Sequence, residues 1–346
     1  MQLESRTTTS HTKPNKKILT KVVIVCFLAL MLFFPASSYY GAKKGLLLWF
    51  NTILPTLLPF IILSNLIIRL QITKPLSRLL YPLFHLLFRV SRGGCYPILI
   101  GFLSGIPVGA KSTADLVKND SISCDEGQFI LGFCNNASPM FIMSYIAIAQ
   151  LNQSNIRIGL ILIMYSSAIL ATLIYFRLLA KPKKTLNHTI SSTQYISSTR
   201  YNDNVEYSKA ETSPQFDFSL LDSAIMDGFE VITKVGGYII LFSIPAQIIS
   251  SIGSNDSLLK LLCIGFLEIT TGINQISQSN LDIGSKIALI TMITAFGGLS
   301  GLAQTKSVIS NTRLSIGTYF KVKLLHMVIA FIMATLYVRL FLFNIL

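Results

Sequence analysis

The sequence predicts an all-α polytopic membrane protein, arranged as an inverted repeat with re-entrant hairpins and broken helices. Hydrophobic residues make up 51% of the 346 residues and charged residues only 13%, about half the share of a soluble domain. Apolar runs long enough to cross a bilayer recur along the chain. Two stretches also share a motif, which is Leu103-Ser104-Gly105 followed by Lys111, and Leu299-Ser300-Gly301 followed by Lys306.

Neither copy of this motif is typical of an ordinary membrane-spanning helix. Glycines, a proline and small polar residues leave backbone groups poorly protected, and lipid cannot satisfy them. Such backbone is tolerated at membrane depth only where it is buried in protein or lines a cavity. Two broken segments at corresponding places in two halves indicate the binding site of a transporter. We therefore expect two re-entrant hairpins, at residues 96–111 and 287–306.

The first membrane half is predicted over residues 18–181, after a disordered cytoplasmic tail at 1–17. Basic residues before the apolar run 22–36 place the N-terminus in the cytoplasm. This run is expected to be an uncleaved first helix, with a signal peptide as the alternative. The next span, 45–70, contains Pro55 and Pro59 and should be bent. Residues 79–90 are apolar with basic flanks, which is typical of an interfacial helix.

The remaining elements follow the same logic. The run 129–149 is interrupted by Asn135-Asn136-Ala137-Ser138-Pro139, whereas the run 158–179 is continuous. Residues 182–217 carry too little apolar surface to fold alone, which predicts a flexible cytoplasmic linker. The second half, 218–346, should contain an amphipathic piece and three further apolar runs beside its hairpin; these are 219–230, 231–249, 258–276 and 319–343.

The candidate solute-binding residues lie in the two hairpins and in the interrupted span. Hydroxyl and amide side chains both donate and accept hydrogen bonds, and a buried helix end offers unpaired N–H groups to an anion. Paired amides in lipid are costly unless they bind something; the alternative is that they only satisfy the kink at Pro139. The predicted binding residues are Ser104, Gly105, Asn135, Asn136, Ser138, Ser300, Gly301, Gln304 and Thr305.

Three charged residues are candidates for a charge or coupling role. Lys111 and Lys306 would face an anionic solute, or alternatively extend to the lipid headgroups or pair with Glu126 and Glu268. Glu268 lies inside an apolar run, and acids within the membrane are candidates for function. If that run is interfacial, Glu268 is simply solvated.

No catalytic, metal or cofactor site is predicted. The four histidines are dispersed without ligand spacing, and the five cysteines form no C-x-x-C pair. The net charge of +14 is spread over short polar connections, which favours a lipid bilayer over nucleic acid as the partner. A remote alternative is an intramembrane serine protease, because Gly298-Leu299-Ser300-Gly301 matches G-x-S-G and His326 follows in the next span. The oligomeric state is left open.

Taken together, these residues resemble a known family, the sporulation integral membrane proteins of the YlbJ (SpoVV) type, which carry a nucleoside-recognition Gate domain. The resemblance covers nearly everything from Gly41 onward. It is carried by Trp49, Leu54-Pro55, Leu58-Pro59-Phe60 and the segments 101–111, 133–141, 265–272 and 295–301.

The resemblance implies a plan like that of concentrative nucleoside transporters. It also implies a role in endospore formation, in which the protein moves dipicolinic acid across the outer forespore membrane of a spore-forming bacterium by alternating access. A nucleoside or another small anion is the alternative solute. A non-transporting membrane assembly protein of the spore is the alternative outside transport.

Overall fold

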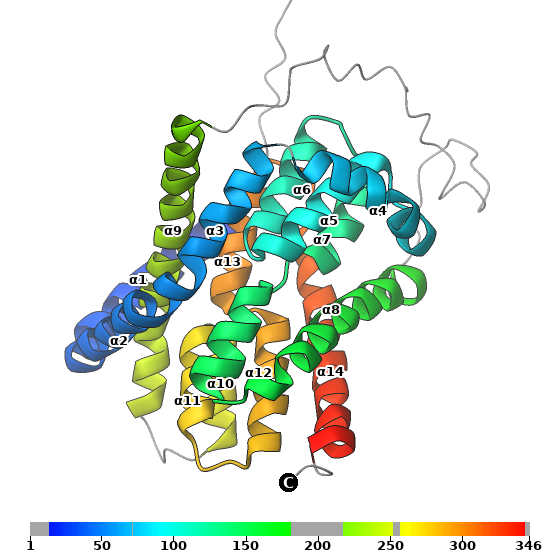
Figure 1. Cartoon of the computed structure of the whole chain (residues 1–346). Coiled ribbons are helices and arrows are strands. Elements are labelled where there is room, and N and C mark those ends of the chain that lie inside the picture. Colours follow the sequence, from blue (N-terminus) through cyan, green and yellow to red (C-terminus); the bar gives the residue numbers. More distant parts are fainter. Residues whose placement is uncertain (1–13, 71, 181–216, 252–256, 343–346) are drawn as a thin grey trace, which may run out of the picture.

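The computed structural model describes residues 14–70, 72–180, 217–251 and 257–342, and all regular elements within these residues are helices (Figure 1). The predicted all-α polytopic class is confirmed. Five of the described helices are long and apolar enough to cross a membrane, and the bent helix pair Pro75–Phe88 and Arg92–Ser104 makes six if it counts as one span. Most of the predicted tail and linker lies outside the described residues. Helix α1 (Pro14–Phe33) begins inside the predicted tail.

Several predicted spans are longer in the structure. The span 45–70 belongs to a helical run from Pro35 to Arg69, formed by α2 (Pro35–Leu48), a π-helical turn (Trp49–Ile53) and α3 (Leu54–Arg69). The π turn lies directly before Pro55, where the helical ladder already lacks one N–H donor. The amphipathic piece and span predicted at 219–249 are one helix, α9 (Phe218–Ser251).

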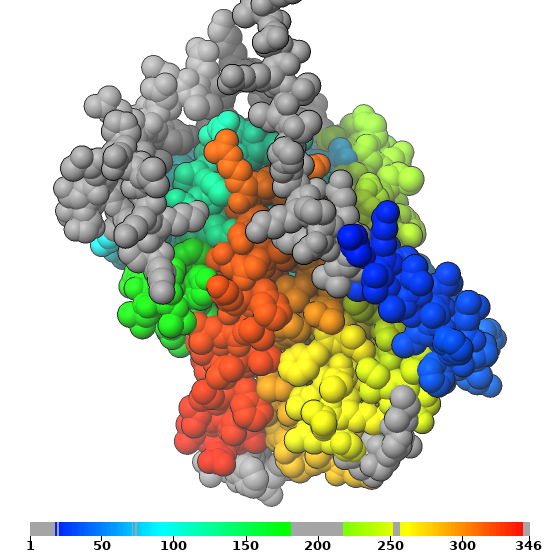
Figure 2. Space-filling model, turned by 180° about the vertical axis from the view of Figure 1, so that it is seen from behind, coloured from blue at the N-terminus to red at the C-terminus, as the bar shows by residue number. Residues whose placement is uncertain are grey.

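Two helices match the predicted spans closely. Helix α8 (Arg157–Ile174) and helix α14 (Ile316–Tyr337) each continue into a π-helical turn, Tyr175–Leu179 and Val338–Leu342. Helix α14 lies on the rear surface of the molecule (Figure 2), and its side chains Val328, Ile332 and Leu336 are exposed. Exposed apolar side chains at helical spacing are what contact with lipid requires.

The first hairpin is formed by α5 (Arg92–Ser104) and α6 (Val108–Lys118), which pack side by side. The chain reverses at 105–107, within the predicted hairpin. Helix α4 (Thr73–Phe88) precedes it at an angle of 97° to α5. Close approach is possible because glycines lie where α5 crosses its neighbours: a Cβ on Gly101 would lie only 2.2 Å from the carbonyl oxygen of Cys134.

The second hairpin is not where the sequence placed it. Residues 287–306 belong to a broken but continuous span, α12 (Ile283–Phe296) and α13 (Gly298–Ile309). The hairpin of this half is instead α10 (Leu258–Leu267) and α11 (Ile269–Gln278), which pack side by side. The reason is Glu268: its extended backbone ends α10, and its carboxylate caps α11 by accepting hydrogen bonds from the N–H groups of Thr270 and Thr271.

The two halves therefore repeat the same order of elements. Each has a long helix, a hairpin, a broken span and a final helix. In the first half these are α3, α5–α6, the broken pair α7 (Cys124–Cys134) and π-helix Phe141–Gln150, and α8; in the second they are α9, α10–α11, α12–α13 and α14. The α5–α6 hairpin and the yellow α10–α11 hairpin lie toward opposite ends of the molecule (Figure 1). Consistently, α13 packs on α6, and the π-helix Phe141–Gln150 packs on α11.

Candidate functional site

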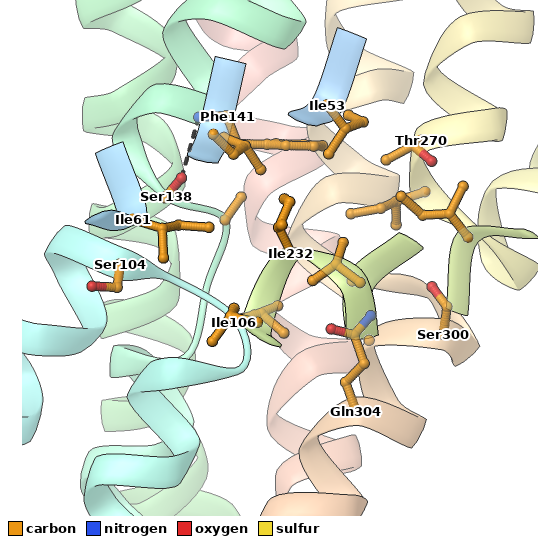
Figure 3. Close-up of a pocket in the computed structure, with 18 of the residues that line it drawn as sticks. Ile53, Ile61, Ser104, Ile106, Ser138, Phe141, Ile232, Thr270, Ser300 and Gln304 are labelled. Atoms are coloured by element: carbon orange, nitrogen blue, oxygen red, sulfur yellow. Dashed lines mark hydrogen bonds between the residues drawn. The ribbon is translucent and has the colours of Figure 1, made fainter. Parts of the chain in front are cut away.

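The four chain breaks of the two halves meet at one cavity (Figure 3). Its empty volume is about 760 Å³, which includes space that is open to the outside. The π-helical turn Trp49–Ile53 and helices α3 and α9 supply apolar walls through Ile53, Ile61 and Ile232. The polar or glycine residues that line it are Ser104, Ser138, Glu268, Thr270, Gly297, Ser300, Gly301 and Gln304.

Hydroxyl groups lie on two sides of this cavity. Figure 3 shows Ser104 and Ser138 on one side, and Thr270 and Ser300 on the other, with Ile106 and Ile232 between them. The first pair belongs to the first half of the chain and the second pair to the second half. A bound solute at this place would contact both halves at once.

The first-half wall is formed where the hairpin turn meets the break in the interrupted span. Gly105 has φ +75°, and a Cβ there would lie 2.8 Å from the backbone N of Ser138, so a side chain would separate the two segments. The backbone N–H of Ile106 donates to the carbonyl oxygen of Asn136 over 2.9 Å. The Ser138 hydroxyl accepts from the Phe141 N–H over 3.2 Å, whereas the buried Ser104 hydroxyl has no partner among the described residues.

The second-half wall is built in the same way. Gly297, with φ +86°, separates α12 from α13. A Cβ on the next residue, Gly298, would lie 3.2 Å from the side chain of Ile269 at the α10–α11 turn. Ser300 and Gly301 lie in the first turn of α13, where backbone N–H groups have no partner within the helix, and Gln304 follows one turn later.

Glu268 is the acidic side chain of this cavity and is only 1% exposed. Its carboxylate accepts from the Thr270 hydroxyl (2.5 Å), the Thr270 N–H (3.1 Å) and the Thr271 N–H (2.6 Å). These donors offset the cost of burying the charge. Glu268 therefore serves as the helix cap and as part of the cavity wall, and it is not the solvated side chain of the alternative interpretation.

Asn135 and Asn136 do not line the cavity; they hold its walls together. Asn135 accepts from the Ala110 N–H (3.2 Å) and donates to Thr305 Oγ1 and to the Tyr319 hydroxyl (both 2.9 Å). Asn136 donates to the carbonyl oxygen of Phe133 (2.6 Å) and accepts from Lys323 Nζ (2.9 Å). Both side chains are fully enclosed by protein, and Asn135 joins three different segments.

The other predicted residues are placed as follows. Gly105 and Thr305 are buried directly behind the lining residues, and Thr305 donates to the carbonyl oxygen of Gly301 over 2.8 Å. Lys111 and Lys306 are exposed and do not line the cavity. The structure thus brings Ser104, Ser138, Ser300, Gly301 and Gln304 together with Glu268, and leaves the two lysines outside.

The sequence reasoning missed a buried polar cluster on α14. Lys323 and His326 are both 0% exposed. Lys323 Nζ lies 3.3 Å from His326 Nδ1, and His326 Nε2 lies 3.0 Å from the Ser167 hydroxyl and 3.1 Å from the carbonyl oxygen of Met164. In the sequence, Lys321 and Lys323 are two basic residues near the start of a span, and nothing in their composition distinguishes them. The available signal was the position of Lys323 on the face of the helix that is buried.

This cluster also bears on the protease alternative. A Ser–His dyad needs a hydrogen bond between the serine hydroxyl and the imidazole. Both ring nitrogens of His326 already have partners, and Ser300 is not among them. Nor do the described residues contain a group of three or more His, Cys, Asp or Glu side chains that could hold a metal ion.

A comparison with curated proteins finds a relative that is similar over most of the chain. It is 27% identical over 348 residues to the sporulation integral membrane protein YlbJ of Bacillus subtilis (strain 168), and the match covers 91% of this chain and 81% of that protein. Over most of its length the chain is therefore similar to a sporulation integral membrane protein. No family model matches the chain, and no solved structure matches it. The match extends over both halves of the chain and therefore includes all four chain breaks around the cavity.

Proposed function

We propose that this protein is a membrane transporter for a small anionic or polar solute, and that the cavity is its solute site. The supporting observation is the meeting of four chain breaks, two from each half, at one cavity. Non-helical backbone at membrane depth needs a protein or aqueous lining. Transporters use such paired breaks to bind solutes near the bilayer midplane.

Alternating access follows from the arrangement of the two halves. The hairpins lie toward opposite ends of the molecule (Figure 1), so each separates the cavity from a different side. Helices α3 and α9 lie between them and are joined by the Arg69–Asp227 ion pair, 2.5 Å long and partly exposed. An exposed pair contributes roughly 0–1 kcal/mol, so it would oppose relative movement of the halves only weakly.

Dipicolinic acid is the solute we propose, to be moved across the outer forespore membrane during sporulation, with the N-terminus in the cytoplasm. Its aromatic ring suits the apolar walls formed by α3 and α9. Its two carboxylates, one on either side of the ring nitrogen, suit hydroxyl groups on two sides of the cavity. The named relative supports the sporulation role, and the solute rests on the resemblance to its family.

A nucleoside is the second candidate, favoured by Glu268. A carboxylate in the cavity wall attracts hydrogen-bond donors such as sugar hydroxyls and repels anions. Glu268 is also the residue that we propose to carry a coupling proton or cation, because it is the acid that lines the cavity.

Uptake by reconstituted vesicles tests this proposal. Purified protein would be compared for accumulation of dipicolinate and of nucleosides, under an imposed sodium or proton gradient or none. We expect saturable dipicolinate uptake that excess unlabelled solute abolishes. A Ser300→Cys variant, otherwise free of cysteine, should lose uptake on thiol modification and be protected by the solute. Protein-dependent uptake of neither solute class would contradict the transporter proposal.

A further inference from the structure

A single lysine stands out among the buried groups of this protein. Lys323 lies on α14 within the last span and is 0% exposed. Its ammonium group lies 2.9 Å from Asn136 Oδ1, 3.3 Å from His326 Nδ1 and 5.9 Å from the centre of the Tyr319 ring. These contacts come from two elements, the break in the first-half span and α14 itself.

The hydrogen-bond pattern assigns the protons in this cluster. Asn136 uses its amide nitrogen to donate to Phe133, so its oxygen accepts from Lys323. His326 Nε2 faces the carbonyl oxygen of Met164, which only accepts, so Nε2 carries the imidazole proton and Nδ1 accepts from Lys323. Lys323 thus donates to both partners, and its ammonium form carries a third N–H donor.

No carboxylate of the described residues balances the charge of the Lys323 ammonium group. Among the described residues, no Asp or Glu lies within ion-pair distance of Lys323, and its polar partners are both neutral. A buried cation without a counter-ion is unfavourable, and in membrane spans such groups face an internal site or a partner charge. The part of the chain that the structure describes therefore supplies no anion to balance a positive charge on Lys323.

The solute cavity lies directly next to this charge. Gly297 lines the cavity, and a Cβ placed on Gly297 would lie 3.9 Å from Lys323 Cε. Glycine leaves no side chain between them. Asn136, which holds the ammonium group, directly precedes the lining residues Ala137 and Ser138. Gly297 is thus the residue that separates Lys323 from the cavity.

We propose that Lys323 is the internal positive charge of the solute site, and that its missing counter-ion is a carboxylate of a small anionic solute. This inference rests on the proposed transport function and names a charge that the exposed Lys111 and Lys306 do not supply. It also explains how a cavity with Glu268 in its wall can take an anion. The solute carboxylate would lie on the Gly297 side, and Glu268 would hold the opposite side through its threonine donors.

The test compares two solutes of the same shape. Dipicolinate and its neutral diamide, pyridine-2,6-dicarboxamide, would be titrated against purified protein in detergent by calorimetry. We expect Lys323→Met to weaken dipicolinate binding by at least about tenfold and to leave diamide binding unchanged. Lys321→Met is the matched control, because Lys321 is exposed two residues away on the same helix and should bind both solutes like the wild type.

A second variant keeps the test decisive if Lys323→Met does not fold. Asn136→Asp places a carboxylate where the amide oxygen lies 2.9 Å from Lys323 Nζ, and this internal counter-ion should weaken dipicolinate binding selectively. Dipicolinate affinity equal to wild type in either folded variant overturns the role of Lys323. Wild-type protein that binds nucleosides but no carboxylate overturns the anion site alone. Wild-type protein that binds and transports none of these solutes overturns the proposed function as well.

Discussion

Nδ2 of Asn135 donates a hydrogen bond of 2.9 Å to Oγ1 of Thr305 and thereby joins the break of the first half to the broken span of the second. Thr305 extends this hydrogen-bond network to the cavity wall, because its hydroxyl donates to the carbonyl oxygen of Gly301. Oδ1 of Asn135 holds Ala110 in the first hairpin. One amide thus positions three segments around a cavity that it does not touch.

Replacement of Asn135 should therefore lower the free energy of unfolding and have a smaller effect on solute binding. Asn135→Leu leaves the Ala110 N–H without its acceptor and should cost about 2–4 kcal/mol of unfolding free energy. Thermal unfolding in detergent, followed by loss of the monodisperse species, measures it. Asn51→Ala, at an exposed position, is the control. Unchanged thermal stability together with lost solute affinity would instead indicate direct contact with the solute.

Two glycine-to-alanine variants, one in the first hairpin and one control on α9, test the close packing of that hairpin. Gly101→Ala would place a methyl group 2.2 Å from the Cys134 carbonyl oxygen, which requires the helices to separate and should cost roughly 1–3 kcal/mol. Gly237→Ala adds the same group on α9 where nothing lies within 4 Å, and should raise stability by up to about 1 kcal/mol. Equal melting temperatures for the two variants would show that the α5–α7 crossing is loose.

Variants at Glu268 should separate its structural role from its charge. Glu268→Ala removes the cap of α11 and should cost about 1–2 kcal/mol, seen as a lower melting temperature. Glu268→Gln keeps one acceptor oxygen, so we expect a smaller loss of stability, with uptake that no longer responds to an imposed proton or cation gradient. Glu230→Gln, at an exposed acid, should change neither property. Gradient-dependent uptake by Glu268→Gln would exclude Glu268 as the coupling residue.

The single tryptophan offers a direct view of helix movement. Trp49 Nε1 donates to the carbonyl oxygen of Ile232 over 2.9 Å, and a Cβ on Gly236 would lie 2.6 Å from the indole ring. Because Ile232 lines the cavity, solute binding that shifts α9 should change the Trp49 emission. Titration of dipicolinate should thus give a saturable fluorescence change that Trp49→Phe abolishes. A change that persists in Trp49→Phe would come from the solute itself.

Hydropathy and breaker residues were sufficient to predict much of the fold. The spans at α8 and α14, the hairpin turn near Gly105 and the break at Asn135–Pro139 all follow from apolar length or from glycine, proline and paired amides. The second hairpin could not be found this way. Residues 258–276 form one apolar run, and the turn within it depends on a single carboxylate that caps the next helix.

The lining of the cavity could be predicted in part for the same reason. Ser104, Ser138, Ser300 and Gln304 lie beside backbone breaks that the sequence displays, and they line the cavity. Lys323 shares its short stretch of sequence with the exposed Lys321, and composition cannot distinguish a buried lysine from an exposed one. Only the packing of α14 against α8 and α12 separates them.

The double role of Glu268 limits how this fold can diversify. The carboxylate that lines the cavity is also the group that ends α10 and begins α11, so its replacement would disturb the hairpin together with the cavity wall. Relatives that handle a different solute should therefore keep an acid or a short capping side chain here. Changes of selectivity would then fall on Gln304, Ser300 and Ser138, none of which has to end one helix and begin another.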